Sequence, residues 1–108
     1  MAISINEFKS VGLKVAKIIA VEDIPGKDKL FKLQLDLGSE KRQIVAGIKP
    51  FYSKEKLEGK LIVVATNLEP ARIAGIESNG MLLAAKTPTG GYALATVDET
   101  VAAGTAIE

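Results

Sequence analysis

The sequence predicts an all-β protein with one domain: a five-stranded barrel with a short helix after its third strand and extra elements at both ends. Three observations carry this prediction. Apolar and polar residues alternate over residues 29–37, as in a strand with one buried and one wet face. Apolar runs at residues 61–65 and 82–85 have the length of buried strands. A short segment with helical composition, residues 53–57, precedes the first of these runs.

The composition disfavours most catalytic functions. The chain has 108 residues, 47% hydrophobic and 25% charged, which is typical of one globular domain and not of a disordered chain. It has no cysteine or histidine, which removes disulfides, thiolate zinc sites and the usual base near neutral pH. No P-loop, GxGxxG, HExxH or EF-hand pattern is present. We therefore expect a protein that is not an enzyme and that uses no metal or cofactor.

Charge and hydropathy leave the type of surface open. No apolar run approaches the roughly 18 residues of a membrane span, and the N-terminus has no signal-peptide pattern, so we expect a soluble, cytoplasmic domain spanning residues 1–108. The net charge is only +1. Lysines cluster at residues 27–32 and 54–60, which is compatible with one basic face and equally with a mixed solvated surface.

The N-terminal half supplies three strands. Ser4 and Glu7 have capping-box spacing, which predicts a short helix over residues 5–10. Residues 11–24 form a long strand whose apolar phase slips near Lys17, as expected for a bulge or for strong coiling. A Pro25-Gly26 turn leads to the second strand, residues 29–37, which pairs as a hairpin with the third, residues 41–48.

The C-terminal half completes the barrel. After the third strand we expect a helix (53–57) ended by Gly59 and a strand (60–68). A loop (70–76), with Gly75 at a special backbone angle, leads to the next strand (80–86). A turn (87–91), a returning strand (92–97) and a tail with short edge pairing (98–108) follow. Three strands, a short helix and two more strands is the order of the five-stranded OB fold, whereas an SH3-like barrel needs no helix at that place.

Five blocks of the sequence resemble the tRNA-binding domain family. They are KLFKL (29–33), RQIVAGI (42–48), GK (59–60), NLEP (67–70) and GIESNGMLLAA (75–85). The family includes the C-terminal appendix or separate β subunit of methionyl-tRNA synthetase and free-standing structure-specific tRNA-binding proteins. The resemblance runs from about residue 8 to residue 107, and the methionyl-tRNA synthetase group is the nearest match. Gly26 and Asn79 depart from the usual pattern and leave local contacts open.

The resemblance implies an OB fold with added terminal elements and a homodimer that binds the outer elbow of tRNA by shape, without chemistry. A methionyl-tRNA synthetase catalytic chain is the implied protein partner. The implied tRNA-binding residues are Lys29, Lys32, Arg42, Asn67, Arg72, Ser78, Met81 and Lys86. The few aromatic residues agree with this, because a single-strand binder needs exposed aromatics on its strands and Phe31 is in phase with the core.

Six of the eight implied residues also have a structural explanation. Lys29 and Lys32 also fit the solvated face of an exposed strand, and Arg42 has Glu40 or Asp36 as an alternative partner. Asn67 and Ser78 are able to satisfy loop backbone groups, and Met81 is able to join the core.

A second class of function stays open: a protein-interaction module or export-type chaperone with the same barrel. A large exposed apolar groove at the dimer seam would favour that class, and a continuous basic face would favour RNA.

Overall fold

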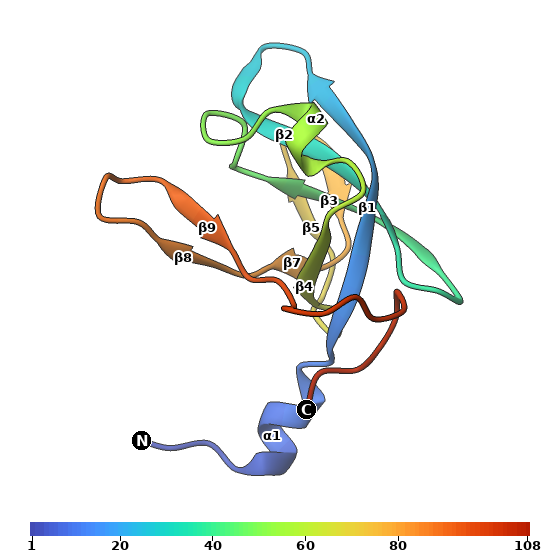
Figure 1. Cartoon of the computed structure of the whole chain (residues 1–108). Coiled ribbons are helices and arrows are strands. Elements are labelled where there is room, and N and C mark those ends of the chain that lie inside the picture. Colours follow the sequence, from blue (N-terminus) through green and yellow to red (C-terminus); the bar gives the residue numbers. More distant parts are fainter.

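Five antiparallel strands form the predicted OB barrel, in the order β3-β2-β1-β4-β7 (Figure 1). The computed structural model describes all 108 residues. The elements are α1 (Ile5–Ser10), β1 (Leu13–Ile24), β2 (Lys27–Asp36), β3 (Lys41–Ala46), α2 (Lys54–Leu57), β4 (Leu61–Ala65), β5 (Ala71–Ile73), β6 (Ile76–Ser78), β7 (Met81–Leu82), β8 (Ala84–Lys86) and β9 (Tyr92–Leu94). Neither helix has the length and apolar character needed to cross a membrane.

The long strand β1 belongs to both halves of the barrel. Its first part, from Leu13 to Lys17, pairs with β4, and its second part pairs with β2. The β1–β2 register shifts between Ile18 and Ala20, next to the phase slip that the sequence shows near Lys17. This irregularity confirms the predicted bulge and lets one strand coil between two partners.

The predicted alternation on β2 builds the core. Phe31, Leu33, Leu35 and Leu37 are all buried, while Lys32, Gln34 and Asp36 alternate with them on the outer face. Ile44 from β3 and residues of β1 and β4 join this cluster. Leu57 from α2 is fully buried in the same core, so the short helix covers one end of the barrel.

Three hydrogen bonds connect β3 with residues 77–79 and close the barrel. The Asn79 N–H donates to the Gln43 carbonyl at 2.8 Å, and the Gln43 side-chain amide donates to the Glu77 carbonyl at 3.1 Å. The Val45 N–H donates to the Ser78 hydroxyl at 3.0 Å. Side chains therefore complete the join where a regular strand ladder is absent.

Several predicted elements and strand ends, most of them in the C-terminal half, were wrong in detail. Residues 70–76 are not an irregular loop but the hairpin β5–β6, whose turn places Ala74 (φ 54°) and Gly75 (φ 77°) in the left-handed region. The expected strand over residues 80–86 is divided at Leu83, so that β7 pairs with β4 and β8 pairs with β9. The strands expected to end at residues 48, 68 and 97 end at Ala46, Ala65 and Leu94.

The C-terminal tail pairs with β1, and the N-terminal end forms the predicted helix. The Ser4–Glu7 capping box forms as predicted at the start of α1. In the tail, the Val15 N–H donates to Thr105 at 2.9 Å and the Ile107 N–H donates to Leu13 at 2.9 Å, which confirms the expected edge pairing. Gly104 (φ +91°) is required there, because an added Cβ would lie 2.1 Å from the Leu37 carbonyl oxygen.

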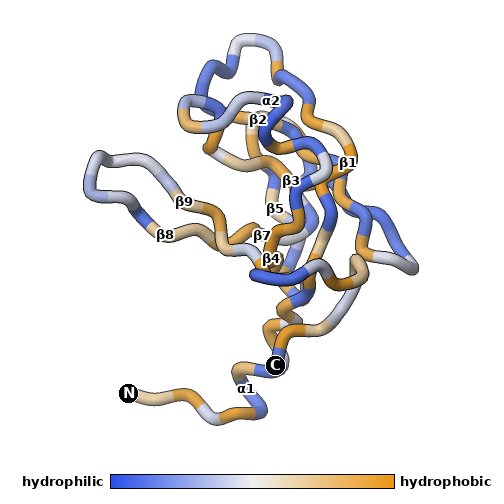
Figure 2. The backbone as a smooth tube through the Cα atoms, in the orientation of Figure 1, coloured by the Kyte–Doolittle hydropathy of each residue, from blue (hydrophilic) through white to orange (hydrophobic).

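Helix α1 and the β8–β9 hairpin project away from the barrel (Figure 1). Ile3, Ile5 and Phe8 at the N-terminal end are exposed, and Figure 2 shows this apolar character along the projecting segment. No residue of α1 is buried, so the helix leaves an unpartnered apolar surface.

Candidate functional site

A chain of polar side chains crosses the outer face of β1, β2 and β3. The Lys32 ammonium lies 3.3 Å from the Glu22 carboxylate. The Gln34 amide nitrogen lies 3.1 Å from a Glu22 oxygen and 3.1 Å from the Gln43 side-chain oxygen. The hydrogen bond from Gln34, and then the one from Lys32, lowers the pKa of the Glu22 carboxyl. Lys32 is thus held in place by β1 rather than free in solvent.

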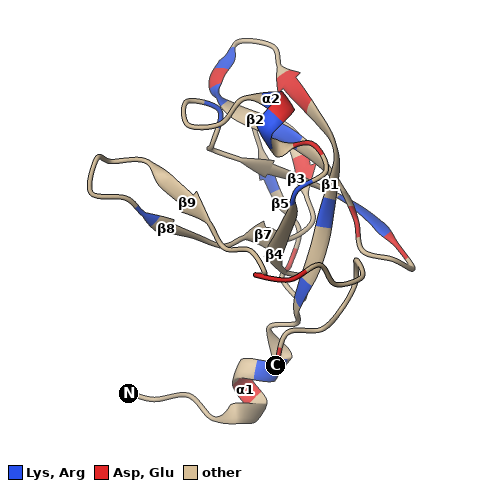
Figure 3. Cartoon of the chain, in the orientation of Figure 1, with Lys and Arg blue, Asp and Glu red and all other residues tan.

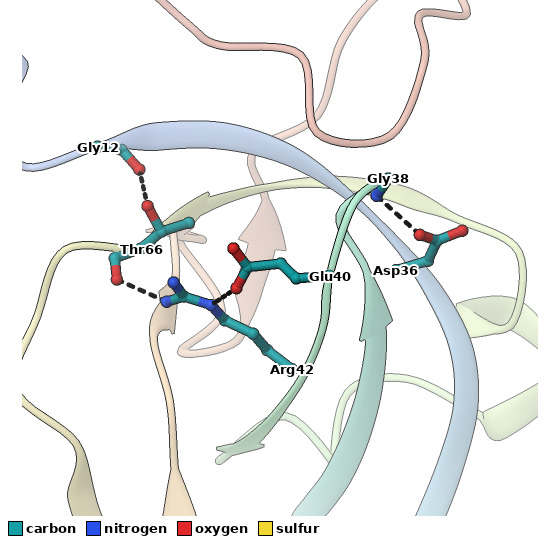
Figure 4. Close-up of polar contacts among 6 residues, drawn as sticks. All are labelled: Gly12, Asp36, Gly38, Glu40, Arg42 and Thr66. Atoms are coloured by element: carbon teal, nitrogen blue, oxygen red, sulfur yellow. Dashed lines mark hydrogen bonds and ion pairs between the residues drawn. The ribbon is translucent and has the colours of Figure 1, made fainter.

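Arg42 on β3 bonds to the residue that follows β4, and that residue bonds in turn to the residue before β1 (Figure 4). Its Nε donates to Glu40, one of the two acids that the sequence offered, and its Nη1 donates to the Thr66 carbonyl at 2.6 Å. The Thr66 hydroxyl donates in turn to the Gly12 carbonyl at 2.6 Å. Hydrogen bonding to Arg42 lowers the pKa of the Glu40 carboxyl. The guanidinium therefore fastens β3 to the end of β4, and the Thr66 hydroxyl extends this link to the start of β1.

Asn67 and Ser78 have structural partners. The Asn67 side-chain amide donates to the Ser10 carbonyl at 2.7 Å, and the Asn67 N–H donates to Val11, so Asn67 fixes the C-terminal end of α1. Ser78 is 3% exposed, and its hydroxyl serves the barrel closure described above. Both bonds join residues more than 30 positions apart, which is why the sequence alone showed only the polar groups.

Three of the predicted cations make no ion pair. Lys29, Arg72 and Lys86 are exposed, and the ion pairs of the structure involve Lys32, Arg42, Lys49 and Lys54 instead. Lys49 and Lys54 both bind Asp23, and Lys54 contributes most to the lowered pKa of that carboxyl. Figure 3 shows basic and acidic residues interleaved along the same elements in this view, which matches the mixed-surface alternative.

An apolar cavity lies beside these residues, between β3, the β5–β6 hairpin and the start of the β8–β9 hairpin. Its volume is about 440 Å³, and ten of its 14 lining residues are hydrophobic. Ser78 lies in its wall, and Met81 lines it while remaining 60% exposed. The sequence pattern revealed neither this cavity nor the roles of Gln34, Gln43 and Asp23, because all depend on contacts between distant segments.

Comparison with known proteins identifies one family, together with relatives that are described either as methionine–tRNA ligases or as chaperones. The family model described as "Putative tRNA binding domain" matches residues 13–106. The methionine–tRNA ligase of Thermotoga maritima is 57% identical over 86 residues, which cover 80% of this chain and 14% of the ligase. The chain spans between 12% and 16% of the length of the methionine–tRNA ligases that it matches.

Two solved structures cover the whole chain. A "MetRS related protein" from Pyrococcus horikoshii superimposes with a TM-score of 0.92 at 37% identity, covering 100% of this chain and 99% of that one. The chaperone CsaA from Bacillus anthracis superimposes with a TM-score of 0.88 at 26% identity, covering 100% of both chains. The same architecture therefore occurs in proteins with two different descriptions.

Proposed function

Because this chain belongs to the tRNA-binding domain family, we propose that it binds the outer elbow of folded tRNA and performs no chemistry. The observation that carries the proposal is the match of the family model to residues 13–106, which include the whole barrel. The outer face of β2 supports it, because that face presents Lys32 and Gln34 and no aromatic side chain on which bases would stack. Such a face suits a folded RNA read by shape and backbone.

Phosphate contacts supply most of the affinity in this proposal. Lys29, Arg72 and Lys86 are available without breaking an ion pair, whereas Lys32 and Arg42 must share their present partners with phosphate. Three to five such contacts predict an affinity loss of roughly 40-fold to 500-fold between 50 and 200 mM salt. Ser78 and Asn67 act by holding the β6 end and α1 in position, and Met81 contributes an exposed apolar contact.

The similarity to methionine–tRNA ligases supports a catalytic chain of that enzyme as the protein partner. Attached to or paired with such a chain, the domain would raise the local concentration of tRNA near the catalytic site. The unpartnered apolar surface of α1 supports a homodimer through the terminal elements. We place these complexes in the cytoplasm, where tRNA is aminoacylated.

A second candidate, protein binding of the chaperone type, has one observation in its favour. The structure contains an exposed apolar cavity, and the relative with 26% identity is described as a chaperone. The higher identities to methionine–tRNA ligases and the tRNA-binding family model favour tRNA.

A binding titration separates the two candidates. Fluorescence anisotropy would compare labelled tRNA, single-stranded DNA of equal charge and an unfolded apolar polypeptide, using wild type, Arg72→Ala and the control Lys56→Ala, which removes an exposed cation from α2. We expect the wild type to prefer tRNA over the other two ligands. Arg72→Ala should bind tRNA more weakly, and Lys56→Ala should bind it with wild-type affinity. Tight binding of the polypeptide with equal, weak binding of both nucleic acids would overturn the proposal.

A further inference from the structure

We propose that the apolar cavity beside Met81 takes up one unstacked base of the bound RNA, whose flanking phosphate is held by Lys86. This inference rests on the proposed function and adds a contact that is not electrostatic. With a net charge of +1 and oppositely charged residues interleaved, phosphate attraction alone gives this chain little preference for one polyanion over another. A site for a base would supply part of that preference.

The cavity has the shape and lining that a planar, weakly polar ring needs. Val45, Ala46 and Ile48 line it from the end of β3, and Leu68, Ala71 and Ile73 line it from the segment that follows β4. Met81 lies at the exposed side, where its flexible thioether is able to cover a ring. The volume of about 440 Å³ lies in the range of sites for small organic ligands.

Two lining residues, Tyr92 and Glu69, suit a base in particular. The Tyr92 ring packs edge-on against Phe51 with 5.7 Å between ring centroids, which fixes its orientation. Glu69 is the one acidic or basic side chain among the lining residues. Its carboxylate is able to accept a hydrogen bond from a ring N–H or an exocyclic amino group, which favours a base over an aliphatic side chain.

Lys86 lies on the cavity side of the β8–β9 hairpin. It is two residues from Ala84 on β8, so both side chains are on the same face of the strand, and Ala84 lines the cavity. Lys86 is also the register partner of Tyr92, a second lining residue. An unpaired ammonium therefore lies next to an apolar hollow, an arrangement complementary to a nucleotide. Ser78 and Met81 are two of the predicted tRNA-binding residues, and both line this cavity, so the cavity lies within the predicted tRNA site.

Methionine NMR tests this directly. The chain has only two methionines, Met81 at the cavity and Met1 at the fully exposed N-terminus. With methyl-¹³C methionine, unfractionated tRNA added to the wild-type protein should move the Met81 methyl signal upfield through the ring current of a base and leave the Met1 signal in place. A Met81 signal unchanged by saturating tRNA would overturn the inference, although tRNA binding itself would remain established.

A pair of substitutions on β8 tests the same inference by affinity. Ala84→Phe fills the cavity, whereas Ala85→Phe adds the same ring to the opposite face of the strand; both positions are exposed, so both variants should fold. We expect Ala84→Phe to weaken tRNA binding about 10-fold or more, the scale of one lost base contact, without changing the salt slope. Ala85→Phe should bind as wild type does.

Other outcomes would assign the cavity differently. Equal tRNA affinity of Ala84→Phe and Ala85→Phe would overturn the base site. A Met81 signal that moves with an apolar peptide and not with tRNA would assign the cavity to a protein segment. Failure of the folded wild type to bind tRNA would overturn the proposed function itself, and the base site with it.

Discussion

The hydroxyl of Ser78 on β6 accepts a hydrogen bond from the backbone N–H of Val45 on β3, at 3.0 Å. Both residues are buried, and they are 33 positions apart in the chain. This contact and the two that Gln43 makes with residues 77–79 close the barrel where no strand ladder does. The block of sequence that resembles a tRNA-binding motif thus also holds the fold together.

Ser78→Ala should destabilise the protein because it leaves the buried Val45 N–H without an acceptor. The expected loss in the free energy of unfolding is about 1 to 3 kcal/mol. Urea denaturation measures it, with Ser39→Ala as control, because Ser39 is exposed in the turn between β2 and β3 and its side chain makes no hydrogen bond in the structure. Wild-type stability of Ser78→Ala would show that Ser78 does not close the barrel.

Arg42→Ala should lower both stability and tRNA affinity. The substitution leaves the carbonyl of buried Thr66 without its donor, which should cost about 1 to 3 kcal/mol of the free energy of unfolding. Arg42→Lys keeps the charge but loses the fork that reaches Glu40 and Thr66 together, so stability should fall while much of the affinity remains. Thermal unfolding and tRNA titration of both variants, with Lys41→Ala as control, separate the two roles.

Phe8→Glu should weaken the proposed homodimer. Phe8 is a half-exposed apolar residue on α1, and removing its burial between two copies should cost about 1.5 to 3 kcal/mol of the dimerisation free energy. Light scattering over a concentration series measures the change. The control is Asn6→Glu, two residues away and so on another side of the helix. A wild-type protein that stays monomeric at every concentration would contradict the dimer.

Acid should remove the stabilising contribution of Glu22, whose carboxylate belongs to the row of polar side chains on the outer face of the sheet. The folded state lowers the pKa of Glu22, so its stabilising contribution is present above the pKa of the unfolded state and is lost as the pH falls through the folded value. Glu22→Gln lacks this contribution, so its free energy of unfolding should decline less steeply in acid than that of wild type. Denaturation series between pH 3 and pH 6, roughly the range in which carboxyl groups titrate, provide the measurement. Glu99→Gln, whose carboxylate has no partner in the structure, should decline as wild type does.

Local patterns were enough to predict the first half of the fold. The alternation that ends at Leu37, the capping box at Ser4 and the phase slip near Lys17 each appear in the structure. The second half was less predictable, because its strands have two or three residues and show no alternation. The β5–β6 turn also places Ala74 at positive φ, a conformation that only the neighbouring Gly75 suggested.

The candidate site could be predicted only as a set of residue types. The sequence showed that Arg42, Asn67 and Ser78 carry hydrogen-bonding groups, but their partners Thr66, Ser10 and Val45 lie 24 to 57 positions away. Which cations are free depends on the same distant contacts, since Lys32 is paired with Glu22 and Lys86 is not paired. The apolar cavity arises from four segments and has no local signature.

The salt dependence of tRNA binding tests the central proposal most directly. The slope of log affinity against log salt would be measured for wild type and for Lys29→Ala, Arg72→Ala and Lys86→Ala, the three cations without ion pairs. Each substitution should reduce the slope by about 1, and the folded Lys56→Ala control should keep the wild-type slope. Equal slopes for all of these proteins, or a wild-type affinity that does not change with salt, would contradict a tRNA interface built from these residues.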